Sequence, residues 1–231
     1  HMLVQDGVCI EGQRDLMMYI TNFYKNLFGH SQEVSISLSL DNVMKVTEED
    51  AIGLITPVTM EELRNVVFDL KKNKSPGPDG MPGEFYIHFW DLIKHDLLDL
   101  INDFQRNSVN IDRLNFGVIT LIPKTKDASQ IQKFRPICLL NVSFKIITKV
   151  LMNRLNGTMA YIISKQQTAF LKNRFIMEGV VILHEVLNSI HQKKQSGILF
   201  KVDFEKAYDK VNWVFIYRML KAKGFPDQWC D

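Results

Sequence analysis

Cysteine is scarce in this sequence, and the positions of its few copies argue against two kinds of stabilised fold. Cys9, Cys138 and Cys230 lie far apart, and no two of them stand at C-x-x-C spacing. This argues against a structural zinc site and a disulfide framework, and it fits a reducing compartment. No run approaches the roughly 20 apolar residues of a membrane span, and no basic segment followed by an apolar stretch begins the chain. We therefore expect a soluble, intracellular protein of the nucleus or cytoplasm, without membrane partners.

Acidic residues are missing from one long stretch. Residues 128–177 contain eight lysines and arginines among fifty residues and no aspartate or glutamate, although the whole chain carries a net charge of only +2. Long basic side chains are seldom buried, so this stretch presents a positive surface. It predicts a polyanion as partner. The alternative is a basic face that acidic neighbours balance in space.

The remaining composition is that of a folded globular protein, with 46% hydrophobic and 23% charged residues. Thr47 with Asp50, and Thr59 with Glu62, have the form of capping boxes and predict two helix starts. Apolar residues at helical spacing predict further helices over residues 16–28, 84–104, 144–155, 174–190 and 213–223.

Strands are fewer than helices in this reading. A short apolar run rich in β-branched residues, 116–122, predicts a strand, and a second strand is expected at 134–140 after a polar connection, so that the two predict a hairpin. A third predicted strand covers residues 198–203. The fold class is therefore α+β, with helices dominating and a short β-hairpin.

Asp203 stands at the carboxyl end of this third strand. Alternation places it on the face opposite Phe200. A carboxylate at such a strand end suits a hard divalent cation such as Mg²⁺, which takes oxygen ligands. The alternative is that Asp203 caps the turn that follows.

Five blocks of the sequence together resemble one family. In chain order they are KNKSPGPDGMPGEFY (72–86), ITLIPK (119–124), FRPICLLN (134–141), QTAFLKNRFI (167–176) and FKVDFEKAYDKVNW (200–213). The series resembles the reverse transcriptases of non-LTR, LINE-type retrotransposons, of the plant-like kind. The resemblance covers nearly the whole chain, and five blocks in the right order are far more specific than any one of them.

The resemblance implies roles for individual residues. Asp203 would coordinate catalytic Mg²⁺ with help from the backbone carbonyl of Phe204, and Tyr208 would stack against the sugar of the incoming nucleotide. Arg135 would hold the triphosphate with Lys124 as its companion across the hairpin. A planar guanidinium suits the paired oxygens of a phosphate. The alternatives are a core aromatic at Tyr208 and an ordinary surface arginine at Arg135.

A further set of residues is expected to contact RNA template or a DNA/RNA hybrid. Some lie around a Pro/Gly turn that exposes backbone N–H groups, and others mix hydrogen-bonding and basic groups near Phe170. The set is Lys71, Lys72, Lys74, Lys145, Lys149, Gln167, Lys172 and Arg174. For the turn, the alternative is a plain connection between helices.

By this resemblance, residues 1–58 form an N-terminal helical extension, residues 59–195 a fingers-like region and residues 196–231 the truncated start of a palm. We expect part of an RNA-directed DNA polymerase that binds RNA or DNA. It is expected to be catalytically incomplete, because the Y/F-x-D-D hairpin and the thumb do not follow and no adjacent Asp-Asp occurs. The alternative is a truncated, retroelement-derived interaction or regulatory factor, with a protein partner at the exposed half-palm.

Overall fold

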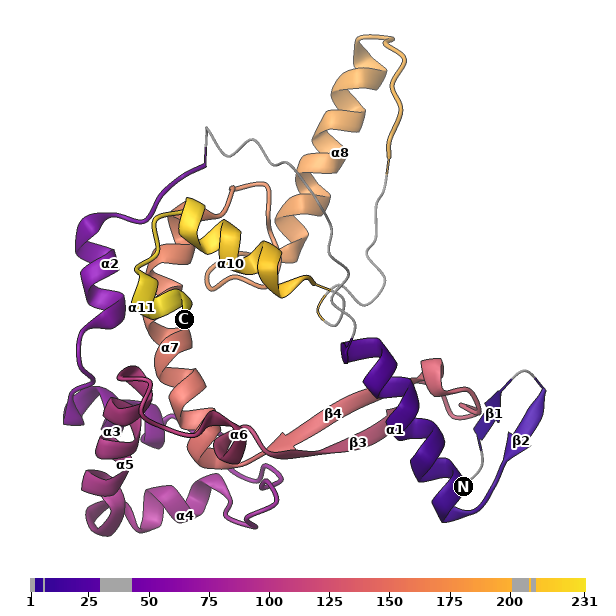
Figure 1. Ribbon diagram of the computed structural model, residues 1–231. Helices are drawn as coiled ribbons and strands as arrows, with labels where there is room; N and C mark the ends of the chain where they lie inside the picture. The colour runs from indigo at the N-terminus through magenta and orange to yellow at the C-terminus, as the bar shows by residue number, and fades with distance from the viewer. Residues whose placement is uncertain (1–2, 6, 30–42, 201–207, 209–210) are drawn as a thin grey trace. The chain divides into compact units, whose positions relative to one another are not determined.

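The computed structural model describes residues 3–5, 7–29, 43–200, 208 and 211–231 of the chain. The fold is α+β and mostly helical, as expected, with two separate two-stranded antiparallel sheets among these residues (Figure 1). The chain divides into two compact units. Unit 1 contains residues 1–32 and 57–151, and unit 2 contains residues 33–56 and 152–231.

Unit 1 begins with a small hairpin and a helix. Strands β1 (Leu3–Gln5) and β2 (Val8–Ile10) pair on either side of Gly7, whose φ of 82° suits a residue without a Cβ. Helix α1 (Gln13–Gly29) confirms the helix expected at 16–28 and begins three residues earlier. The first hairpin was not predicted, because three-residue strands are too short to show alternation.

The main core of unit 1 is formed by helices. They are α3 (Met60–Phe68), α4 (Gly83–His88), α5 (Trp90–Gln105), α6 (Ile111–Leu114) and the first half of α7 (Val142–Ile162). Leu63, Val67, Ile146 and Ile147 in this core are at most 1% exposed. Thr59 caps α3 as expected, because its side chain accepts a hydrogen bond from the backbone N–H of Glu62 at 3.2 Å.

The single helix expected at 84–104 is wrong in one respect, since the structure has two helices there. Phe89 separates α4 from α5 with φ −95° and ψ 18°, outside the regular helical range. Its N–H still bonds to the carbonyl of Phe85 at 3.0 Å, so the chain bends without losing that hydrogen bond. The expected apolar stripe is confirmed, because Trp90, Leu97 and Ile101 are buried. Periodicity reports a buried face but not the dihedral angles of one residue.

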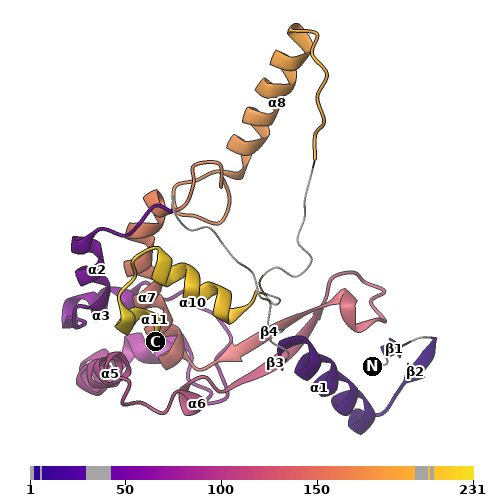
Figure 2. The same cartoon turned by 45° about the horizontal axis from the view of Figure 1, so that its top comes forward.

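The predicted hairpin is confirmed as strands β3 (Gly117–Pro123) and β4 (Phe134–Leu140). The strands are antiparallel, and Ile122 faces Arg135. Leu121 and Phe134 pack in a cluster with Tyr24 of α1 and the buried Ile131. Figures 1 and 2 show α1 crossing this end of the hairpin.

Unit 2 contains α2 (Glu48–Ile55), the second half of α7, α8 (Ile176–Gln192), α10 (Trp213–Ala222) and α11 (Asp227–Cys230). Its core is centred on Leu54, Ile162 and Phe225. Helix α7 is longer than the expected 144–155. It continues through Gly157 because Thr158 and Ile162 are buried beyond it, which offsets the low helix propensity of glycine.

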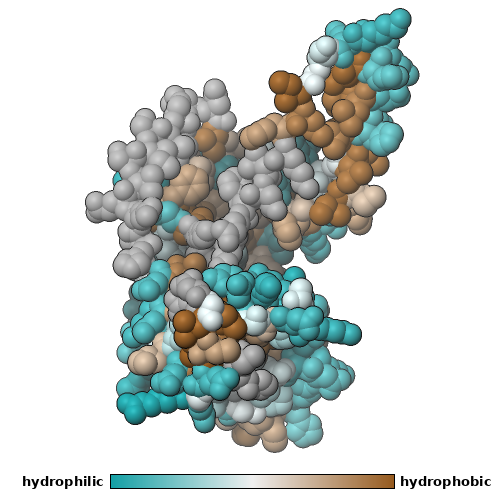
Figure 3. All heavy atoms as spheres, turned by 90° about the vertical axis from the view of Figure 1, so that its right-hand side faces the viewer, coloured by the Kyte–Doolittle hydropathy of each residue, from teal (hydrophilic) through white to brown (hydrophobic). Residues whose placement is uncertain are grey.

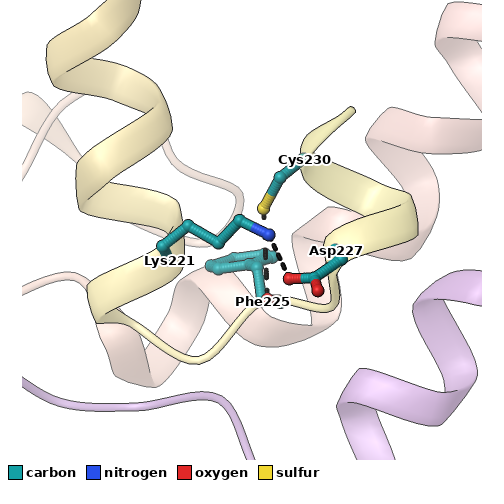
Figure 4. A network of polar contacts seen from close by, with 4 residues as sticks. All are labelled: Lys221, Phe225, Asp227 and Cys230. Carbon is teal, nitrogen blue, oxygen red and sulfur yellow. Dashed lines mark hydrogen bonds and ion pairs between the residues drawn. The ribbon is translucent and has the colours of Figure 1, made fainter.

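The C-terminal helices α10 and α11 are joined by polar contacts (Figure 4). Lys221 forms an ion pair with Asp227, and this contact raises the pKa of Lys221. The Cys230 thiol lies 4.0 Å from the carbonyl oxygen of Phe225, and burial raises its pKa. These contacts brace the end of unit 2.

Helix α8 carries many exposed apolar side chains. Val180, Val181, Ile182 and Val186 are each 50–53% exposed, and Figure 3 shows apolar colour along this helix at the top of the view. The strand expected at 198–203 is not formed in its described part, because residues 198–200 pair with no described strand and are exposed. The rest of that segment, Asp203 included, lies outside the described residues. Among the helices that are described, none is both long and apolar enough to cross a membrane.

Candidate nucleic-acid interface

The closed end of the β3–β4 hairpin gathers basic side chains. Arg135 and Lys124 are both exposed, and Lys124 directly follows β3. The backbone N–H of Lys124 donates to the carbonyl of Lys133 at 2.8 Å, and its Nζ donates to the carbonyl of Gln132 at 2.9 Å. The hairpin thus brings Lys124 and Arg135 to one end, as the sequence predicted.

One face of the hairpin stays open beside Arg135. Residues directly opposite in an antiparallel pair share a face, so Ile122 and Arg135 lie on the same side. On that side Val118, Ile122 and Ile137 are 42–49% exposed. The hairpin therefore offers an apolar surface that ends in a guanidinium.

Sequence reasoning left out Lys133, which is exposed and bonds through its carbonyl to Lys124. Lys133 ends a short 3-10 turn (Ile131–Lys133) just before β4, and its hydrogen bond to Lys124 places the two residues side by side at the closed end of the hairpin. The hairpin register could have identified it. The tip of the hairpin therefore carries Lys133 beside Lys124 and Arg135, and the exposed Lys126 and Asp127 lie in the same connection.

Residues 69–82, which we call the basic loop, join α3 to α4. Pro76 and Pro78 exclude helix here, and the N–H of Gly80 bonds to the carbonyl of Gly77 at 3.0 Å to close a turn. Gly80 has φ +71°, a value that glycine adopts without strain. Three lysines precede or enter the turn, and all three are exposed: Lys71, Lys72 and Lys74.

The turn of the basic loop lies against Asn141, the residue between β4 and α7. A Cβ on Gly77 would lie 2.4 Å from both the backbone nitrogen and Oδ1 of Asn141. The same Oδ1 accepts a hydrogen bond from the N–H of Asp79 at 3.2 Å. The loop is therefore in direct contact with the start of α7.

Two lysines of α7 also hold the basic loop. Lys149 Nζ lies 2.7 Å from Oδ2 of Asp69, and this ion pair keeps the pKa of Asp69 below its ordinary value. Lys145 Nζ lies 3.5 Å from the carbonyl oxygen of Ser75. Both lysines were expected to contact nucleic acid; in the structure their amino groups face the loop that carries the exposed lysines.

The other side of the basic loop is tied to α4. Asn73 has φ +56°, a left-handed conformation that asparagine tolerates, and its N–H donates to the Glu84 carboxylate. This backbone hydrogen bond is the main reason why the pKa of Glu84 is lowered, and the charge of Lys72 adds to it. The loop that carries Lys71, Lys72 and Lys74 is therefore held by contacts to α7 on one side and to α4 on the other.

In unit 2, Arg174 is surrounded by backbone carbonyls. Its Nη1 donates to the carbonyls of Ser164 and Gln167, the latter at 2.7 Å. Its Nη2 donates to the carbonyls of Ala160 and Ile163, at 3.0 and 2.7 Å. One guanidinium thus joins the end of α7 to the loop 164–175.

The remaining residues expected on this loop face solvent. Gln167 and Lys172 are exposed, and the Gln167 amide donates to the carbonyl of Ala169 at 3.1 Å. Phe170 is fully exposed with φ +65°, and Asn173 has φ +62°. Positive φ is uncommon for a bulky residue such as phenylalanine, whereas asparagine tolerates it.

Of the residues expected to contact the metal ion and the nucleotide sugar, the structure describes only one. Asp203 and Phe204 lie outside the described residues, and Tyr208 is 93% exposed. Within the part of the chain that the structure covers, no three His, Cys, Asp or Glu side chains gather closely enough to hold a metal ion. The described residues therefore supply no metal centre of their own.

Comparison with known proteins identifies this region. Residues 122–231, which begin in β3 and include Lys124, Arg135 and Asp203, match the family described as "Reverse transcriptase (RNA-dependent DNA polymerase)". This region is therefore similar to the reverse transcriptases. The family as a whole uses divalent metal ions and binds a nucleic-acid template.

Relatives extend the likeness over the rest of the chain. The chain is 29% identical over 231 residues to the "Transposon TX1 uncharacterized 149 kDa protein" of Xenopus laevis, covering 98% of this chain and 18% of the relative. It is 28% identical to the Pol polyprotein of retrotransposable element R2DM of Drosophila melanogaster, covering 75% of this chain and 16% of the relative. It is 26% identical to the "RNA-directed DNA polymerase from mobile element jockey" of Drosophila funebris, covering 67% and 17%.

These relatives confirm the expected resemblance of the reverse transcriptase region to non-LTR retrotransposon enzymes. The chain spans less than a fifth of the length of each of these three relatives. They come from a frog and from insects, so the plant-like part of the expectation stays a prediction.

Proposed function

We propose that this chain forms the fingers and the beginning of the palm of an RNA-directed DNA polymerase, and that it binds RNA template or a DNA/RNA hybrid. In this proposal residues 59–195 act as fingers, residues 196–231 as the start of the palm and residues 1–58 as an extension. The observation that carries it is the exposed group Lys124, Lys133 and Arg135 at one end of the hairpin.

Charge and geometry favour a phosphate-rich ligand at this hairpin end. The guanidinium of Arg135 offers paired donors for phosphate oxygens, and Lys124 adds a point charge. The open apolar face beside Arg135 suits the flat surface of a base or sugar. We propose that these residues hold the triphosphate of an incoming nucleotide and, when no nucleotide is bound, the phosphates of an RNA strand.

The remaining roles follow the family pattern. We propose that Asp203, with the carbonyl of Phe204, contributes to Mg²⁺ binding, and that Tyr208 contacts the nucleotide sugar. The exposed Lys71, Lys72, Lys74, Gln167 and Lys172 are proposed to contact nucleic acid directly. Lys145, Lys149 and Arg174 are proposed to support this surface through the protein contacts described above. Nucleus and cytoplasm are both compatible with this function.

The proposal is tested by titrating labelled single-stranded RNA with the protein over a series of salt concentrations. Phosphate contacts release counterions, so affinity should fall steeply as salt rises. Arg135→Ala and Lys124→Ala should each weaken binding and reduce the slope of log affinity against log salt by about 0.7 per lost contact.

Arg106→Ala is the matched control. Arg106 is exposed in the same unit but lies 3.9 Å from Asp103, so it adds little positive potential. Its replacement should leave RNA affinity unchanged. Absence of binding at low salt, or equal losses for Arg106 and Arg135, would contradict the proposal. Absence of binding would favour the alternative of a non-catalytic interaction factor.

A further inference from the structure

Gly77 of the basic loop lies unusually close to Asn141, the residue between β4 and α7. We propose that these two residues form a positioning device that holds Lys71, Lys72 and Lys74 in one place for the phosphates of a bound strand. This inference rests on the proposed nucleic-acid binding and assigns the residues that orient it.

The space around Gly77 leaves no room for a side chain. A Cβ on Gly77 would meet the Asn141 nitrogen and Oδ1 at 2.4 Å and the Leu140 carbonyl carbon at 2.5 Å. Two of these three atoms are backbone, which cannot rotate away. Glycine is thus required by close approach, since Gly77 is not among the residues with positive φ. The loop and the end of β4 can only meet in this way if residue 77 has no side chain.

Asn141 connects the basic loop to two neighbouring elements. Its side-chain oxygen accepts the N–H of Asp79 at 3.2 Å, and its carbonyl accepts the N–H of Lys145 in the first turn of α7 at 3.2 Å. It also directly follows β4, the strand that carries Arg135. One residue therefore sets the basic loop relative to both a helix and the hairpin.

Strand β4 sets the distance between the hairpin tip and the basic loop. Six residues of extended chain separate Arg135 from Asn141, which corresponds to about 20 Å. The hairpin tip and the basic loop are thus two basic groups at a fixed separation in one unit. A polyanion several nucleotides long has phosphates over such a span, whereas a single nucleotide does not.

The contacts of the basic loop also reduce the conformational entropy that it would lose on binding. Fixing one residue in a single backbone conformation is unfavourable, and a free loop would undergo this ordering at the moment of binding. The contacts Asp69–Lys149, Ser75–Lys145 and Asp79–Asn141 order the loop beforehand. The lysines then meet phosphate without further ordering of the chain.

The test is a double-mutant cycle in RNA binding with the 231-residue protein and labelled single-stranded RNA. The triple change of Lys71, Lys72 and Lys74 to Ala should reduce the salt slope by about 2, at roughly 0.7 for each lost phosphate. Asn141→Ala, which removes the acceptor without adding a clash, should weaken binding about tenfold, as for the ordering of about one residue. In the Asn141→Ala protein, the triple lysine change should then have a clearly smaller effect.

Gly77→Ala is the second variant and should behave like Asn141→Ala. Circular dichroism checks that both variants are folded, and hydrogen exchange at the Asp79 amide checks that the contact is lost. Gly157→Ala is the matched control, because a Cβ there meets nothing within 4 Å. It should leave RNA binding unchanged.

The outcomes separate the two levels of the proposal. If folded Asn141→Ala protein loses Asp79 protection but keeps the affinity and the full lysine effect, the positioning role is overturned while the proposed function stands. If the wild-type protein shows no salt-dependent RNA binding, the proposed function fails and the positioning role fails with it.

Discussion

Arg174 shows at the scale of one residue why a basic side chain does not by itself mark a nucleic-acid contact. Its sequence context, beside Lys172 and a phenylalanine, suggested template binding. In the structure its guanidinium donates to four backbone carbonyls, which belong to Ala160, Ile163, Ser164 and Gln167. A charge engaged in this way supports the loop whose other residues face solvent.

We predict that Arg174→Ala and Arg174→Lys both destabilise unit 2, by about 2–4 kcal/mol for the alanine variant, because several carbonyls lose a charged donor. Lysine keeps the charge but cannot reach four carbonyls with one ammonium group. Thermal and urea unfolding measure the effect. A lysine variant with wild-type stability would show that charge, not the geometry of the guanidinium, is what residue 174 supplies.

At the scale of elements, the basic loop depends on carboxylates that hold it between α3, α4 and α7. The pKa of Glu84 is lowered chiefly by the Asn73 N–H, and that of Asp69 chiefly by Lys149. A carboxyl group whose pKa is lower in the folded state stabilises that state above its unfolded pKa. The stabilisation is lost as pH falls through the folded pKa.

We therefore predict that the Asn73 amide loses hydrogen-exchange protection, after correction for the intrinsic rate, as pH falls below the ordinary glutamate pKa of 4.5. Exchange measured by NMR between pH 6 and pH 3 follows this amide directly. In Glu84→Gln the acceptor oxygen remains but the titration is removed, so the pH dependence should shrink to the part contributed by Asp69. An unchanged pH profile in that variant would refute the role of Glu84.

At the scale of the whole molecule, we expect these residues to bind nucleic acid without catalysing DNA synthesis. The sequence holds a basic surface and one proposed metal carboxylate, Asp203, but no adjacent Asp-Asp pair. Two-metal phosphoryl transfer draws on several anionic ligands held together, and a single carboxylate binds hydrated Mg²⁺ weakly.

We predict that these 231 residues, tested by themselves with primer, RNA template, Mg²⁺ and dNTPs, do not extend the primer, although they bind the RNA. Gel analysis of the labelled primer measures extension, and the salt titration above measures binding in the same preparation. A complete reverse transcriptase serves as the positive control for the reagents. Extension that depends on Asp203 would show that the ligands present are sufficient.

The sequence by itself predicted two helix caps, the β3–β4 hairpin and the resemblance to a family. The caps at Thr47 and Thr59 and the paired runs of β3 and β4 are confirmed, because each depends on residues close together in the chain. The five ordered blocks likewise predicted the resemblance to reverse transcriptases that the match over residues 122–231 supports.

Only the tertiary structure decided how the basic residues are used. Lys145 meets Ser75 across 70 positions and Asn141 meets Asp79 across 62, and no local pattern reports such a contact. Periodicity records which face of an element is apolar, not which distant segment lies against a given lysine or arginine. The division between residues that face solvent and residues that hold the loop in place is therefore a result of packing.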